Sequence, residues 1–114
     1  MANTFNTADL DITNSETLLY TAPNSSGDVA IGLSLRITNI DGAADDVITA
    51  NIYESDGSTL KAAIASTMTV PMDSSIELMG TSKIVLKQGE QIKLLGGAAS
   101  GDLQAYLSVL EITA

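Results

Sequence analysis

Acidic residues in two neighbouring loops are the side chains whose type and spacing come nearest to a chemical site. Asp41, Asp45 and Asp46 lie in one segment and Asp56 lies in the next. Carboxylates gathered in this way could bind calcium, which takes roughly six to eight oxygen ligands. The EF-hand spacing, with acids at alternate positions and a final Glu, is absent. Aspartates in turns usually cap the local backbone, so we favour solvated turns over a metal site.

Other kinds of catalysis have even less support in the sequence. Paired carboxylates can hydrolyse glycosides, but the chain has no Trp and 3 Tyr to form a sugar platform. A Ser–Lys pair would be a coincidence in a chain with many serines and 5 basic residues. The glycines at Gly96, Gly97 and Gly101 do not have a phosphate-binding spacing. We therefore expect no enzyme, with no catalytic, cofactor-binding or metal-binding residue.

The chain contains neither cysteine nor histidine. Disulfides, thiolate metal sites and cysteine nucleophiles are excluded. The commonest general base and the commonest transition-metal ligand are missing as well. We expect no cofactor, and the composition fits synthesis in a reducing cytoplasm.

The net charge is −9, from 14 acidic and 5 basic residues. Nucleic-acid binding needs Lys and Arg to displace phosphate counterions, so a nucleic-acid partner is not expected. Residues Met1–Thr13 lack the basic and apolar regions of a secretory signal, and no stretch approaches the ~20 apolar residues of a membrane helix. We therefore expect no membrane partner either.

Three of the five cations, Lys83, Lys87 and Lys93, are expected on one hairpin. If the apolar residues between them face inward, the lysines point outward together. The favoured interpretation is that they keep an edge soluble and unpaired. The alternative is a positive patch that binds an acidic surface, such as the Asp41–Asp46 loop of a neighbouring copy.

The clearest structural element is an alternating run over residues 29–38. Its apolar members are Val29, Ile31, Leu33, Leu35 and Ile37, separated by small or polar residues. Because successive side chains of a strand point to opposite faces, we expect these five on one face of a half-buried strand.

Similar short runs recur, separated by turn residues every ~8–12 positions. The pattern predicts an all-β fold, an antiparallel β-sandwich of jelly-roll or immunoglobulin-like type, with about eight short strands and no long helix. Residues Leu60–Met68 fit a strand face and a helix face equally well. The preceding Asp56-Gly57 hairpin signal favours a strand over a single helical turn.

The first residues form a polar segment. We divide the chain into residues 1–16, an N-terminal arm or an edge strand, and residues 17–114, the β-sandwich domain. In the first segment, only Phe5, Leu10 and Ile12 could pack. These three, with the three lysines, are our candidate protein-interface residues.

The last strand changes its apolar phase. One set of apolar residues alternates along it: Leu103, Ala105, Leu107 and Val109. Leu110 and Ile112 then continue on the opposite phase, which would invert the faces. A β-bulge near Val109 and Leu110 would absorb this change. Alternatively, the core covers one face of the strand and a partner subunit covers the other.

Three stretches of the sequence share a rhythm with a known class of proteins. These are LYTAP (Leu19–Pro23) followed by VAIGLSLRITNIDGAADDVITANIYESDG, then VPMDSSIELMGTSKIVLKQGEQIKL (Val70–Leu94), and GDLQAYLSVLEI (Gly101–Ile112). The chain resembles small β-sandwich virion structural proteins of tailed bacteriophages, of the marine and cyanophage type. No catalytic motif carries the resemblance.

The resemblance implies a capsid decoration or cement protein that binds the outer capsid surface and stabilises the head. Its partner would be the major capsid protein, and it would form a homo-oligomer, with a trimer favoured. It would be made in the host cytoplasm and located in the virion. The alternatives are a neck, tail or fibre component of the virion, or a carbohydrate-binding or adhesin module.

Overall fold

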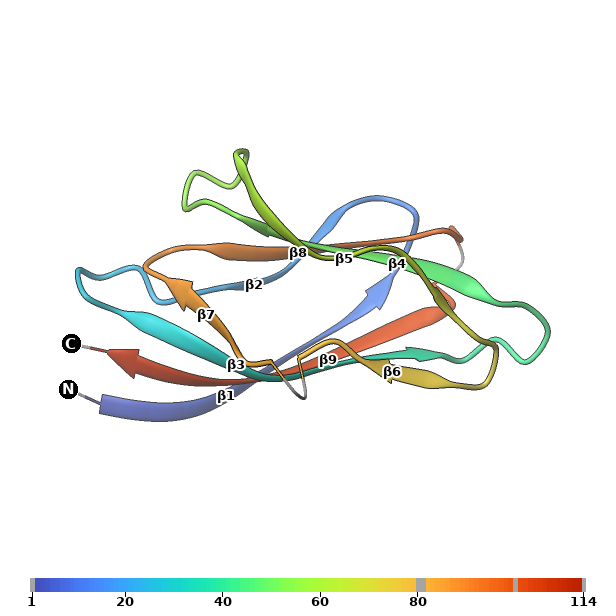
Figure 1. Ribbon diagram of the computed structural model, residues 1–114, viewed down its shortest axis with the longest axis horizontal. Helices are drawn as coiled ribbons and strands as arrows, with labels where there is room; N and C mark the ends of the chain where they lie inside the picture. Colours follow the sequence, from blue (N-terminus) through green and yellow to red (C-terminus); the bar gives the residue numbers. More distant parts are fainter. Residues whose placement is uncertain (1, 80–81, 100, 114) are drawn as a thin grey trace.

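The computed structural model describes residues 2–79, 82–99 and 101–113, which form nine strands (Figure 1). The strands are β1 (Ala2–Ile12), β2 (Thr17–Thr21), β3 (Val29–Asn39), β4 (Asp46–Tyr53), β5 (Leu60–Val70), β6 (Ser75–Glu77), β7 (Ile84–Lys87), β8 (Gln91–Gly96) and β9 (Leu103–Thr113). Within this described part, no helix has the length and apolar character needed to cross a bilayer.

The strands form two sheets that face each other, as Figure 1 shows. The first sheet has the order β1-β9-β3-β6, with β7 also paired to β3, and the second has the order β2-β8-β4-β5. All pairs are antiparallel. This confirms the predicted antiparallel β-sandwich.

The order of the strands selects the jelly roll over the immunoglobulin-like arrangement. β6 and β7 pair with different parts of β3, so together they act as one interrupted strand. Each sheet then has four strands, and β1, β2, β3 and β4 alternate between the sheets. In an immunoglobulin fold, the first two strands share a sheet instead.

The core is made of aliphatic side chains from the inner faces of both sheets. The largest fully buried ones are Ile12, Leu35, Ile37, Ile48, Met79, Leu86, Ile92, Leu94, Leu103, Leu107, Val70 and Val109. Burying side chains of this size stabilises a fold by about 1.5–3 kcal/mol each. Asn39 is also buried, and its amide donates to the carbonyls of Ala44 (3.1 Å) and Val70 (3.0 Å).

Residues Leu60–Val70 form a strand, as the sequence favoured, and not a helical turn. The Asp56-Gly57 turn joins β4 to β5, with Gly57 at φ 75°. The pairing of β5 with β4 shifts register three times, and Thr67 has φ 51°. β5 is therefore a strongly irregular edge strand.

Residues Ala2–Ile12 of the N-terminal segment form an edge strand, one of the two forms expected for residues 1–16. β1 pairs with β9 along its whole length, from Ala2 opposite Thr113 to Ile12 opposite Leu103. No register shift interrupts this pairing. Ala2 and Thr113, the first and last described residues, therefore lie side by side at one end of the sandwich (Figure 1).

Candidate functional site

A β-bulge in β3 determines which residues form the outer face of the first sheet. Gly32 pairs with Val109 and Ser34 pairs with Ser108, so Leu33 is an extra residue in β3. The burial pattern inverts at this point, with Ala30 fully buried before it and Leu35 fully buried after it. The prediction that all five apolar residues of residues 29–38 share one face is therefore wrong. An inserted residue moves every side chain before it to the opposite face.

The same bulge corrects the prediction for the last strand. β9 keeps its register with β1 through Val109 and Leu110, so the irregularity lies in the neighbouring β3 and not in β9. Val109 is buried, whereas Leu110 and Ile112 are half-buried on the outer face. The alternative that the core covers one face of β9 fits this arrangement, and a partner on the other face stays a prediction.

Glu77 supports the bulge, a role that no local sequence pattern indicates. Its carboxylate accepts hydrogen bonds from the Ser34 hydroxyl (2.8 Å) and the N–H groups of Leu35 (2.7 Å) and Met79 (3.0 Å). Burial alone would raise the pKa of Glu77, but these donors and the charge of Arg36 outweigh it and lower the pKa. Glu77 therefore occupies donors beside the bulge, where the ladder is interrupted.

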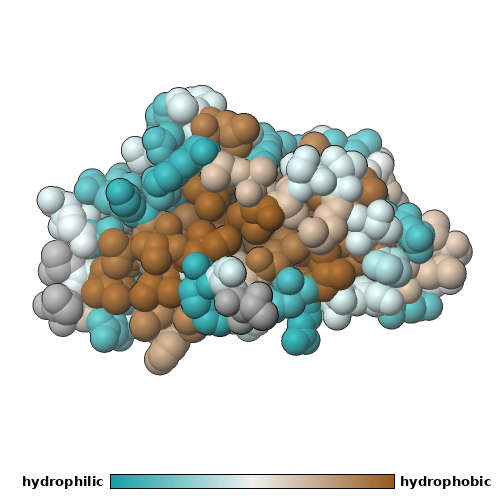
Figure 2. Space-filling model, in the orientation of Figure 1, coloured by the Kyte–Doolittle hydropathy of each residue, from teal (hydrophilic) through white to brown (hydrophobic). Residues whose placement is uncertain are grey.

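Because the bulge turns Val29 and Ile31 outward, the first sheet has an apolar area on its outer face. The register aligns Phe5, Leu110, Ile31 and Val85 in one row across β1, β9, β3 and β7. Ile112 and Val29 lie in the adjacent row. We call these six residues the apolar face. Phe5 is 77% exposed and Val85 is 57% exposed. Figure 2 shows hydrophobic surface beside the chain ends, where β7 and the start of β3 lie in Figure 1.

The other half of the same sheet face is polar and hollowed. The hollow has a volume of about 330 Å³. Its lining comes from β1, β3 and β9: Asp9, Leu10, Asp11, Arg36, Thr38, Gln104, Ala105 and Tyr106. The Asp9, Asp11 and Arg36 side chains make no hydrogen bond or ion pair with other described residues. Tyr106 is 52% exposed, so this half offers polar groups and one ring to solvent.

Of the three N-terminal candidates, the structure places one on the apolar face. Phe5 lies on the apolar face. Leu10 is half-buried and packs against the core, and Ile12 is 1% exposed within it. Burial leaves Ile12 no surface for a partner.

The three candidate lysines do not share a hairpin, and this prediction is wrong. β7 belongs to the first sheet and β8 to the second, so the turn between them is a corner between sheets. Lys83 donates to the Leu33 carbonyl (3.1 Å), at the bulge. Lys93 donates to the Gly57 carbonyl (2.6 Å) and lies 4.6 Å from the centroid of the Tyr53 ring. The lysines are therefore divided between two sheets and do not form one patch.

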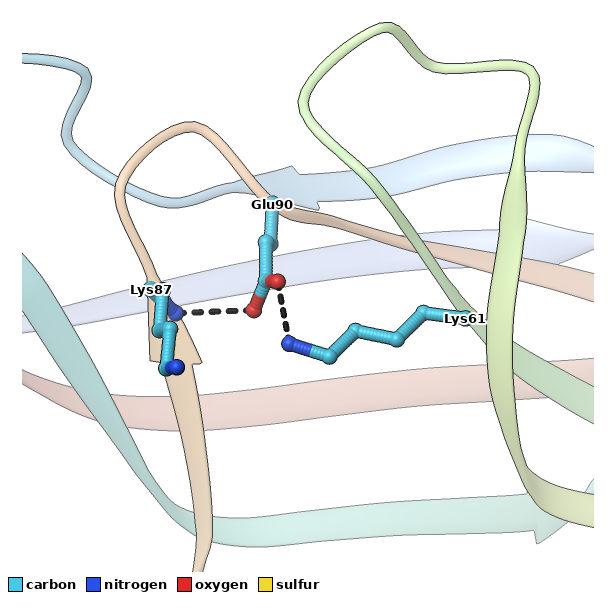
Figure 3. Close-up of polar contacts among 3 residues, drawn as sticks. All are labelled: Lys61, Lys87 and Glu90. Atoms are coloured by element: carbon cyan, nitrogen blue, oxygen red, sulfur yellow. Dashed lines mark hydrogen bonds and ion pairs between the residues drawn. The ribbon is translucent and has the colours of Figure 1, made fainter.

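The corner next to Lys87 holds a buried carboxylate. Glu90 is 5% exposed and accepts hydrogen bonds from the Lys87 N–H (2.8 Å) and from the Lys61 ammonium, as Figure 3 shows. Burial alone would raise the pKa of Glu90, but the donors and charges of Lys61 and Lys87 outweigh it and lower the pKa. This cluster ties β5 to the corner and has the character of a structural ion pair.

The loop aspartates accept hydrogen bonds from backbone N–H groups, some in their own turns and some in other loops. Asp41 accepts from the Ala43 N–H (2.8 Å), and Asp46 accepts from the Val47 N–H (2.7 Å). Asp45 accepts from the Met72 N–H (3.0 Å), and Asp46 also accepts from the Gly97 N–H (3.0 Å). The hydroxyl and N–H of Thr59 lower the pKa of Asp56 to about 2. In the described ranges, no group of three or more acidic side chains is placed to hold a metal ion.

Comparison with known proteins identifies a fold and no family. No family model matches the chain, and no curated protein matches it. One similar solved structure comes from Bacillus endospore appendages, described as a novel family of disulfide-linked pili. The similarity covers 98% of this chain and 87% of that one, with a TM-score of 0.59 and 17% identity. At this identity, the likeness concerns the fold alone.

Proposed function

We propose that this protein is a non-enzymatic structural component of a tailed-bacteriophage particle, most specifically a decoration or cement protein that binds the outer capsid surface and stabilises the head. The observation that carries the proposal is the apolar face, defined above. Phe5 and Val85 at its ends expose most of their side chains. Contiguous exposed apolar surface on a small protein typically marks an interaction site.

The polar half of the same sheet supports a defined orientation on the partner. Arg36 lies on β3 between the carboxylates of β1 and the carboxylate of Glu77 on β6, in register with Tyr106. Charged groups beside an apolar contact fix the register of an interface and speed association. The major capsid protein would supply the complementary surface.

Repetition accounts for how a small contact could stabilise a head. A single interface of ~800 Å² per partner loses much of its apolar gain to association entropy and desolvation. Copies bound around symmetric sites raise the avidity without new contacts. The net charge of −9 also fits a place outside the packaged nucleic acid.

A filament subunit is the second candidate, and the similar solved structure favours it. That protein belongs to pili described as disulfide-linked, and its likeness spans nearly the whole of this chain. This chain has no cysteine, so disulfide links cannot join its copies. A neck, tail or fibre component of the virion would share this filament-like role.

A carbohydrate-binding or adhesin module is supported by the hollow alone. It combines the exposed Tyr106 ring with Arg36 and two carboxylates on an open sheet face. Binding of a defined saccharide on a glycan array, lost in Tyr106→Ala, would favour this function over the structural one.

Cryo-electron microscopy of the intact particle tests the main proposal. We expect the protein on the outside of the head in on the order of hundreds of copies, with the first sheet towards the capsid. A few or tens of copies at the neck or tail would replace the proposal with the tail-component alternative.

A pair of matched variants tests which sheet makes the contact. Val85→Asp on the first sheet is expected to weaken binding to undecorated heads about tenfold or more. Leu60→Asp is the control, because Leu60 is similarly exposed (56%) but belongs to the second sheet. Equal binding by both variants would contradict the assignment of the apolar face.

A further inference from the structure

The outer edge of β1 has no strand beside it in the described part of the chain. β1 is the first strand of its sheet, and only β9 pairs with it. Such an edge presents a row of unpaired N–H and C=O groups that can pair with another strand. The edge is eleven residues long and has no register shift.

The other edges of the sandwich carry features that oppose pairing. β5 shifts register three times, and β2 has five residues and one shift. β6 and β7 have three and four residues. Bulges and short strands are the devices by which natural sheets protect their edges. β1 lacks both, and its segment Ala2–Ala8 contains neither a charged residue nor a proline.

Phe5 shows which surface a strand added at this edge would meet. Its side chain is 77% exposed and ends the row that continues through Leu110, Ile31 and Val85. A strand beside β1 would extend this row by one position. An apolar or aromatic side chain opposite Phe5 would therefore complete it.

The charges of β1 favour a second copy of β1 in antiparallel orientation. Asp9 and Asp11 lie in its second half. A two-fold axis at Phe5 pairs Ala2–Ala8 of one copy with the same segment of the other, and Asp11 then extends beyond the partner's strand. Parallel pairing in register would instead place each aspartate beside its copy, which is destabilising.

We propose that two copies of this protein join by antiparallel pairing of β1 with β1 about a two-fold axis, with the two Phe5 side chains adjacent. The first sheets of both copies then form one continuous sheet. The proposal goes beyond the function proposed above, because it concerns the free protein whether or not it binds a capsid. It gives a dimer instead of the favoured trimer, since a ring of three needs β1 to meet a different edge of the next copy.

A charge exchange at position 5 tests the contact. We expect wild type to sediment as a dimer of the 11.8 kDa chain. The dimer should be tighter at higher salt, because salt screens the repulsion between two copies that each have a net charge of −9. Phe5→Asp and Phe5→Lys should each weaken dimerisation ~10-fold or more, while their mixture should form a heterodimer. Leu60→Asp, on the second sheet, should dimerise like wild type.

Oxidative cross-linking provides an independent measurement in the full chain. Directly opposite residues of antiparallel strands have Cα atoms ~4.5–5.5 Å apart, within disulfide range. The chain has no cysteine, so Phe5→Cys can form a disulfide only between copies and should give a covalent dimer on mild oxidation. Leu60→Cys should not.

Four outcomes would overturn the proposal: a monomeric or trimeric wild type, a dimer that survives Phe5→Asp, no heterodimer in the mixture, or equal cross-linking of Phe5→Cys and Leu60→Cys. Loss of capsid binding by Val85→Asp with an intact dimer would leave this proposal standing. The two proposals therefore fail separately.

Discussion

At Glu90, burial and neighbouring charges act on the carboxylate in opposite directions. It lies at the corner between the sheets, and its carboxylate has the Lys61 ammonium and the Lys87 N–H as donors. A buried charge is tolerated only when such partners replace water. Lys61 comes from β5, the irregular edge, so Glu90 anchors the strand whose pairing shifts register most often in the second sheet.

We expect Glu90 to make stability depend on pH in the acid range. Its folded-state pKa is lowered from an ordinary value of 4.5, so its contribution is complete above that value. The contribution is lost as the pH falls through the lower folded-state pKa. Urea unfolding at pH 7 should show Glu90→Gln less stable by about 1–2 kcal/mol, with a smaller loss towards acid pH.

Asp9→Asn is the control for this prediction. Asp9 is exposed and bonds to no other described side chain, so the variant should unfold in urea at pH 7 with about the stability of wild type. The lowered pKa of Glu77 leaves some acid dependence in both variants. An unchanged profile in Glu90→Gln would contradict the assigned role.

At the scale of elements, the bulge in β3 is a feature that the alternation of apolar and polar residues does not predict. The strand itself was predictable from residues 29–38, but its change of face was not. The inner face has no room for a side chain at position 32, because a Cβ there would lie 2.6 Å from Met79 Sδ. A long-range neighbour thus occupies the space, and nothing near Gly32 in the sequence signals it.

A double-mutant cycle between Gly32 and Met79 tests this packing. Gly32→Ala should cost about 1–3 kcal/mol by overpacking, and Met79→Ala about 2–4 kcal/mol by leaving a cavity. Because the added methyl enters the vacated space, the double variant should cost less than the sum. Additive losses in urea unfolding would show that the two side chains do not share this space.

The corner between β7 and β8 shows a second limit. The turn at residues 87–90 was predictable, and Gly89 adopts φ 72° there. Turn residues specify a reversal, but they do not specify whether the flanking strands pair with each other or enter different sheets. The Gly89 N–H donates to the Pro23 carbonyl (3.1 Å), a distant contact that local patterns do not contain.

At the scale of the whole molecule, the sandwich was predictable and its topology was not. Short alternating runs and the absence of long helical patterns sufficed for two packed antiparallel sheets. The strand order depends on pairings such as β1 with β9, between opposite ends of the chain. The apolar face follows from that order together with the bulge. Phe5 was the one member named among the candidate interface residues, and Leu110 and Ile112 were considered only as a strand face that a partner subunit could cover.

The pairing of the first and last strands has a consequence for biosynthesis. A ribosome delivers β9 only about a hundred residues after β1, at roughly 5–20 residues per second. The nascent chain therefore carries an unmatched β1 for seconds, in a polysome where other copies are also emerging. Ala2–Ala8 carries neither a charge nor a proline, so premature encounters between neighbouring nascent chains would use the same edge that the finished protein presents.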